Sequence, residues 1–165
     1  MSAEDELKII AEQEARLVFD GFDEDKAYEI GTYIREAGRA IGKGLVAGVF
    51  TWDRTLFWGA TAGSTSTNWS WATRKVSLVK IMFKSTYRIV LERGDKPRLL
   101  EPNWGMEPSQ YAIAGGAFPI RVKSVGIIGA VAVSGLHERD DHEFARSAIA
   151  RSLGHAADAF ALPPA

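Results

Sequence analysis

The sequence predicts an α+β domain in which helices pack on an antiparallel sheet. Apolar residues recur with helical spacing towards both ends of the chain, and two pairs of short apolar segments between them predict β-hairpins. No internal repeat and no linker rich in Pro, Gly or Ser divides the 165 residues. We therefore expect a single domain over 1–165, which is long enough to bury a full core without disulfides or metals.

Three helices are expected in the first half of the chain. The first covers about 4–18, and the second covers 27–41 behind the capping residue Asp23. The third covers about 69–83 and follows a polar loop that ends at Asn68. Each has apolar residues every three or four positions, as expected for a helix that packs one face on a sheet.

Two predicted hairpins form the sheet. They pair 45–50 with 55–60, and 117–122 with 126–134. The final strand, 126–134, lacks the polar alternation of a half-exposed strand, so we expect both of its faces to be covered. Helices would cover one face and a subunit partner the other, and Gly129 would let another backbone approach closely.

The remaining segments connect and complete these elements. Residues 87–91 could continue the third helix after a break or form a strand, and of these we expect the broken helix. Residues 93–116 form a connector too long to be left unpacked in a compact domain. Asp140 is expected to cap a final helix whose buried face includes Ala145. The tail 161–165 is expected to be flexible.

Composition excludes several classes of function. The 20 basic and 21 acidic side chains leave a net charge of −1, which gives no electrostatic basis for binding nucleic acid or an acidic membrane. The absence of cysteine excludes disulfides, thiolate nucleophiles and cysteine-bound metals. The chain has no apolar stretch of membrane-spanning length, and its acidic start lacks a secretory pattern. We therefore expect a cytoplasmic protein with neither nucleic acid nor membrane as a partner.

Lys75 is the residue whose position is most informative about function. On a helical wheel it lies opposite the polar stripe of the third helix, in the middle of the apolar face beside Trp71. A buried ammonium group needs an anion, a carboxylate partner or a route to solvent. The functional interpretation is an anchor for an anionic ligand in a pocket between this helix and the sheet, lined by Trp71. The structural alternative is a lysine that is ion-paired or reaches solvent.

Arg74 lies beside Lys75, at the edge of the same helix. If the helix begins near Asn68, both cations lie within about two turns of its N-terminus, where free N–H groups favour anions. Carboxylates or phosphates could bind there. The alternative is a capped helix behind a polar loop, without a ligand.

The tract 137–143 contains two histidines and several acids. Acids are expected at the start of a helix, and no diagnostic spacing of metal ligands occurs, so we expect no metal site. His142 falls on the core side of the final helix. There it could make a structural hydrogen bond, ligate haem iron or act as an acid–base.

Gly115 and Gly116 directly precede a predicted strand. A glycine pair permits backbone conformations, or a close approach of a ligand, that other residues do not. An ordinary tight turn explains the pair equally well.

Taken together, five motifs resemble the haem-degrading-domain family, which includes the GlcG-like and HbpS-like proteins, and its single-domain branch with bacterial and fungal members. The motifs are Asn68-x-x-x-Ala72-x-Arg74-Lys75, Gly115-Gly116-Ala117-Phe118-Pro119-Ile120, Val125-Gly126-x-x-Gly129, Val133-Ser134-Gly135-Leu136 and Asp141-His142. The resemblance covers nearly the whole chain.

This resemblance implies a profilin-like fold, assembly into dimers or larger rings, and binding or breakdown of haem. The positions that it marks for ligand binding are Arg74, Lys75, Gly115, Gly116, Pro119, Ser134 and His142. It supplies no iron ligand, and Met106, Tyr111 and His137 are only chemically possible ones.

We therefore expect an oligomeric binding protein for a small anionic ligand, with haem as one possibility. The alternative is a non-enzymatic assembly or adaptor protein that acts through an oligomer surface built from the final strand and the N-terminal helix. A third reading, an enzyme with His142 as acid–base and Lys75 as electrophile, lacks a recognisable nucleophile or bound metal.

Overall fold

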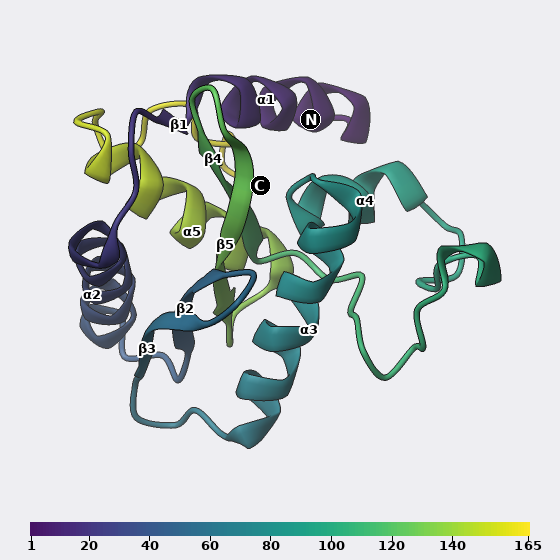
Figure 1. The fold of residues 1–165 in the computed structure, drawn as a ribbon, viewed down its shortest axis with the longest axis horizontal. Coiled ribbons are helices and arrows are strands. Elements are labelled where there is room, and N and C mark those ends of the chain that lie inside the picture. Colours follow the sequence, from purple (N-terminus) through teal and green to yellow (C-terminus); the bar gives the residue numbers. More distant parts are fainter.

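A five-stranded sheet in the order β1-β4-β5-β2-β3 forms the middle of the molecule (Figure 1). The computed structural model describes every residue from Met1 to Ala165. Its strands are β1 (Val18–Phe19), β2 (Val46–Thr51), β3 (Thr55–Ala60), β4 (Ala117–Val122) and β5 (Gly126–Ser134). Its helices are α1 (Ala3–Arg16), α2 (Glu24–Ala40), α3 (Ser66–Met82), α4 (Thr86–Arg93) and α5 (Glu138–Ser152), with a 3-10 turn η1 (Pro102–Trp104).

The predicted α+β fold and both hairpins are confirmed. β2 pairs with β3, β4 pairs with β5, and β5 joins the hairpins by pairing with β2, all antiparallel. The sheet is mixed, however, because the two-residue strand β1 lies parallel to β4, with Val18 opposite Arg121. β1 follows directly on α1, and a strand of two residues leaves no periodic signal in the sequence.

The chain's own helices cover both faces of β5. Val131 and Val133 pack in the core formed with α2 and α5, whereas Ala130 and Ala132 pack in a second core beneath α3. The prediction that a subunit partner covers one face is therefore wrong. Small alanines on the α3 side let this helix lie close to the sheet, so the strand is buried within one chain.

Gly129 has the role that the sequence predicts. A Cβ placed on it would lie 1.8 Å from the carbonyl oxygen of Phe50 on the neighbouring strand. Side chains do not fit at that distance, so glycine is required for β2 and β5 to approach at this point.

Two helices start earlier than predicted because other residues cap them. α3 begins at Ser66, where Thr65 and Asn68 form a capping box. α5 begins at Glu138, and His137 rather than Asp140 accepts the capping hydrogen bond, from the N–H of Arg139. The earlier start of α3 gives it an N-terminal turn ahead of the predicted site.

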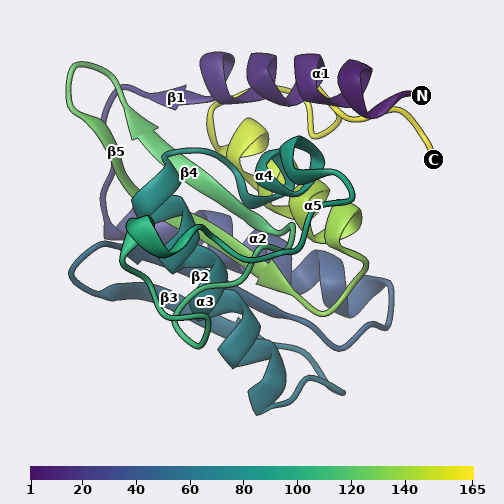
Figure 2. The ribbon, with the colours of Figure 1, turned by 90° about the vertical axis from the view of Figure 1, so that its right-hand side faces the viewer.

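α1 lies across one end of the molecule, near both ends of the chain (Figure 2). A third apolar cluster beneath it joins Ile10 of α1, Leu78 of α3 and the connector residues Tyr111 and Ile113. Leu162 also enters this cluster and is 6% exposed. The sequence predicts a flexible tail over 161–165, whereas the structure packs its first half against the core.

Candidate functional site

Lys75 forms a buried ion pair with Asp141. Lys75 is 3% exposed, and its Nζ donates to Asp141 Oδ2 at 3.1 Å and to the carbonyl oxygen of Val133 at 3.0 Å. The other oxygen of Asp141, Oδ1, accepts from the N–H of Leu136 at 3.0 Å. Of the partners that the sequence allowed for this ammonium, the structure supplies a carboxylate from the first turn of α5.

Burial opposes the charges of both groups. It lowers the pKa of Lys75, an effect that the nearby Asp141 carboxylate partly offsets. It raises the pKa of Asp141 to about 6, although Lys75 and the N–H of Leu136 act in the opposite direction. The pair is close to neutral as a unit, so Lys75 alone does not attract an anion from solution.

The glycine pair makes room for these groups. Gly116 has φ +132°, and a Cβ on it would lie 2.7 Å from Lys75 Nζ and 2.4 Å from the oxygen of Val133. A Cβ on Gly115 would lie 2.5 Å from the carbonyl oxygen of Glu138. The protein itself therefore fills the space that both glycines leave, and neither lines a cavity.

A cavity of about 280 Å³ lies above the ion pair, between α3, the end of β5 and the start of α5. Its lining is mostly polar and consists of Asn68, Trp71, Lys75, Ala114, Ser134, Gly135, Leu136, Glu138 and Asp141. The structure thus brings together three of the predicted ligand-binding residues, Trp71, Lys75 and Ser134. The cavity is smaller than the roughly 300–1,000 Å³ typical of sites for drug-sized ligands.

Trp71 also lines a second cavity, of about 170 Å³, which includes Arg74 and Arg98. The guanidinium of Arg74 lies over the Trp71 ring, 4.5 Å from its centroid. Arg74 Nε donates to Ser70, and no carboxylate lies within ion-pair distance of Arg74. Arg98, by contrast, forms a two-point ion pair with Glu138. The cation without a counter-ion at this site is therefore Arg74.

Besides the glycine pair, two predicted site residues, Pro119 and His142, lie away from the cavity. Pro119 is buried in β4, opposite Ala130, and does not line the cavity. β1 pairs only with Arg121 and Val122, so no strand lies beside β4 on its outer side at Pro119. A proline has no N–H to donate to such a neighbour, so it fits at this position. The place of Pro119 in the sheet therefore explains the proline, and no role in ligand binding is needed.

His142 is completely buried in the core on the other side of α5. Its Nε2 lies 2.8 Å from Gln13 Oε1, its ring packs near Tyr87 and Phe118, and its Nδ1 has no hydrogen-bond partner. Burial lowers the pKa of His142 to about 3, and Arg146 and Arg139 add to this effect. His142 is therefore a neutral, buried residue with a structural hydrogen bond, which is one of the three roles that the sequence allowed.

The residues around the cavity do not fit ligation of haem iron. No His, Met, Tyr or Cys lines it, and these are the usual axial ligands. His137 caps α5, and the hydroxyl of Tyr111 accepts from the N–H of Leu100 at 2.8 Å. Met106 packs against the cluster beneath α1. No group of three or more His, Asp and Glu side chains in the structure could hold a metal ion.

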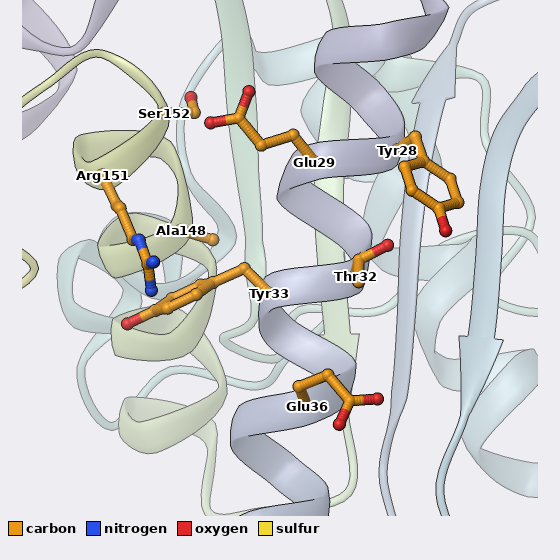
Figure 3. A pocket seen from close by; sticks show the side chains of 8 residues that line it. All are labelled: Tyr28, Glu29, Thr32, Tyr33, Glu36, Ala148, Arg151 and Ser152. Carbon is orange, nitrogen blue, oxygen red and sulfur yellow. The ribbon is translucent and has the colours of Figure 1, made fainter.

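The largest groove, about 510 Å³, lies elsewhere, between α2 and α5 (Figure 3). Its carboxylates are already paired, Glu29 with Lys26 and Glu36 with Arg35 and Arg39. Arg151 lies over the Tyr33 ring at 4.6 Å, which makes it a counterpart of the pair at Arg74. The groove lacks a buried polar group, so we do not place the functional site there.

Sequence reasoning missed Asp141, Glu138 and Arg98. The signal for Asp141 is its place beside His142 in the last of the family motifs, but 66 residues separate it from Lys75. Nothing in the periodicity of one helix identifies a partner on another. Arg98 lies in the connector, and only the packing of that segment brings it to Glu138.

Residues 22–150 match the family described as haem degrading protein HbpS-like. A UPF0303 protein of Brucella melitensis is 42% identical over 156 residues, which cover 94% of this chain and 92% of that protein. One of Mesorhizobium japonicum is 42% identical over 154 residues, 93% of this chain and 92% of its own.

None of the helices combines the length and apolar composition that crossing a membrane requires.

Solved structures share this fold. The Ybr137w protein superposes with a TM-score of 0.80, at 25% identity and 90% coverage of each chain. HbpS superposes with a TM-score of 0.64, at 20% identity, over 81% of this chain and 91% of its own. A PduOC–heme complex superposes with a TM-score of 0.66, at 14% identity, over 79% and 94%. The last two likenesses are evidence of fold alone.

Proposed function

Because this chain belongs to the family of HbpS-like haem-degrading proteins, we propose that it binds a planar anionic small molecule in the groove around Trp71. The observation that carries the proposal is the state of Arg74. Its guanidinium lies over the Trp71 ring, lines the cavity of about 170 Å³ and has no carboxylate partner. An arginine held in this way can pair with a ligand carboxylate or phosphate in two-point geometry.

Each part of the groove has a distinct role in this proposal. Arg74 supplies the charge, and the exposed face of Trp71, a side chain that is 39% exposed, stacks on the plane of the ligand. Asn68 and Ser134 supply hydrogen bonds within the larger cavity. The Lys75–Asp141 pair forms a rigid floor whose polar atoms already have partners.

Haem is the first ligand to test, because the family is described by it and a protein of this fold is known as a haem complex. The lining residues offer no iron ligand, so recognition would depend on the ring and its carboxylates. A metal-free porphyrin should then bind as well as haemin. This expectation separates ring recognition from iron ligation.

The test is a titration of the protein with haemin, with protoporphyrin and with a one-ring aromatic carboxylate, followed by tryptophan fluorescence and by porphyrin absorption. We expect Arg74→Ala to weaken binding of the preferred ligand by about tenfold or more, as loss of a charged hydrogen bond does.

Arg151→Ala is the matched control, because Arg151 also lies over an aromatic ring and has no carboxylate partner, on the other side of the molecule. Equal binding by the wild-type protein and Arg74→Ala would refute the site. Binding of haemin but not of protoporphyrin would show that the iron, and a ligand outside the cavity, carries recognition.

The second candidate function is a non-enzymatic assembly protein, and one observation favours it. The final strand cannot form the assembly surface because α3 and α5 cover it. The edge strand β3, by contrast, has a neighbouring strand on one side only. An assembly function would therefore depend on β3 and on residues that the ligand groove does not use.

A further inference from the structure

We propose that the free edge of β3 is a self-association surface, at which β3 of a second copy pairs antiparallel about a twofold axis and extends the sheet. This inference is independent of the ligand proposed above. It is drawn from the backbone of one strand, the aromatic side chains on both sides of it and the charges on the neighbouring helix α2.

The backbone of β3 has groups along its outer edge that no strand pairs. β3 pairs only with β2, and the N–H of Thr61 donates to Leu45 on that side. Because alternate residues of a strand point in opposite directions, Ala60 and Trp58 direct their backbone groups away from β2. Arg35 Nε donates to the carbonyl oxygen of Ala60 from outside, at 3.1 Å, which agrees with this direction. A second strand that pairs at Ala60 would displace this side chain.

The residues of the strand itself lack the features that protect exposed strands, and the protection at the Ala60 end comes from Arg35 of α2. Its six residues, Thr55-Leu-Phe-Trp-Gly-Ala60, include no charge and no proline. Natural proteins usually place lysine, proline or a covering segment at such an edge. An unprotected edge in a folded protein is a template for another strand.

Exposed aromatic side chains lie on both sides of the edge. On the α2 side, Tyr28 is 65% exposed and its ring packs on Phe57, with centroids 6.0 Å apart. On the α3 side, Trp69 is 42% exposed and packs on Trp58 at 4.1 Å. Figure 3 shows the Tyr28 ring on the side of α2 away from Tyr33. Pairing of two β3 edges would bury these rings, which are the residue types that dominate interfaces.

The charges favour a second copy in antiparallel orientation. The ion pair of Glu24 with Arg54 places the start of α2 beside the Thr55 end of β3, and the contact of Arg35 with Ala60 places its later half beside the other end. The first end has a net negative charge, because Asp23, Glu24, Asp25 and Asp53 outnumber Lys26 and Arg54. The second has a net positive charge, because Arg35, Arg39 and Lys43 outnumber Glu36, which pairs with both arginines. A twofold axis brings the acidic end of each copy to the basic end of its partner, so the surface is complementary to itself.

Sedimentation velocity over a range of protein concentrations tests this proposal. We expect the wild-type protein to form dimers or larger even-numbered assemblies. Tyr28→Glu should weaken the association by about tenfold or more, because it replaces an aromatic anchor with a charge. Ala60→Pro should do the same, since it removes an outward N–H.

Val125→Glu is the matched control, because Val125 is 70% exposed in the β4–β5 turn, outside the proposed surface. Tyr28 lies on a helix surface, so far-UV circular dichroism of Tyr28→Glu should be that of the wild-type protein. Its ligand titration should also be unchanged, which separates this inference from the proposed binding function. A wild-type protein that stays monomeric at high concentration, or a Tyr28→Glu variant that assembles as Val125→Glu does, would overturn the proposal.

Discussion

At the scale of single residues, the site is built on a buried charge that the protein neutralises for itself. Lys75 and Asp141 are each less than 5% exposed in their side chains, and each also contacts a backbone group. Desolvation of two charges offsets most of their attraction, so such a pair contributes geometry more than stability. The neighbouring cation, Arg74, has no carboxylate partner, and it is the one to which we assign ligand binding in the proposed function. The sequence identified the buried cation but not which of the two cations was free.

The buried pair predicts a specific pattern in a double-mutant cycle. Lys75→Met leaves a buried carboxylate without a cation, and should lower the free energy of unfolding at pH 7 by about 3–5 kcal/mol. Lys75→Met/Asp141→Asn removes both charges and keeps an acceptor for Leu136, so the two changes should couple by about 0.5–3 kcal/mol. Urea unfolding of the four proteins measures this. Purely additive losses would mean that the two groups do not interact.

His142 predicts a dependence of stability on pH. Its pKa falls from 6.5 to about 3 on folding, so the unfolded chain binds a proton between these values and the folded protein does not. The stability from this group is complete above pH 6.5 and is lost as the pH falls, by up to about 1.4 kcal/mol per pH unit. His142→Gln retains a partner for Gln13 and should flatten this part of the curve. Parallel unfolding curves for both proteins between pH 7 and pH 5 would contradict the assignment.

At the scale of elements, the sequence predicted well whatever depends on local periodicity. Both hairpins and α2, with its cap at Asp23, occur where expected because spacing and capping are local signals. The starts of α3 and α5 were misplaced because Thr65 and His137 precede them with extended backbone, a feature that composition does not specify. A residue near the start of a helix is then placed wrongly as well: Asn68 was expected before α3 but lies in its first turn.

The contact between β2 and β5 predicts a large effect of one methyl group. Gly129→Ala would place a carbon 1.8 Å from the oxygen of Phe50, and only displacement of backbone could relieve this clash. We expect a loss of stability of about 1–3 kcal/mol or more. Gly21→Ala is the control, because no atom lies within 4 Å of the added carbon there. Thermal melting of the two variants compares them, and equal melting temperatures would contradict this packing.

At the scale of the whole molecule, the contacts that the sequence could not predict are those between distant segments. The tail is one case. Gln13 of α1 donates to the carbonyl oxygen of Phe160, and Glu143 of α5 accepts from the N–H of Leu162. Polar residues such as Gln13 and Glu143 are expected on the exposed face of a helix, so their contacts with the tail could not be predicted from the helical pattern. The cover of β5 by helices on both faces is another case, because one strand's composition cannot distinguish a helix of the same chain from a subunit.

The packing of the tail predicts that its residues contribute unequally to the free energy of unfolding. Deletion of 162–165 removes a leucine that is 6% exposed and should cost about 1.5–3 kcal/mol of the free energy of unfolding. Deletion of 164–165 alone removes two exposed residues and should have no measurable effect. Chemical unfolding of both truncated proteins measures the difference. A tail that can be removed entirely without loss would be flexible, as the sequence suggested.

The central claim is that Arg74, stacked on Trp71, holds the charge of a planar ligand. Native mass spectrometry of the protein purified from cells tests it most directly, because it reports retained mass and the number of chains together. The wild-type protein and Arg151→Ala should carry the same small-molecule adduct, and Arg74→Ala should lose it. An adduct that Arg74→Ala retains at the wild-type level would contradict the claim.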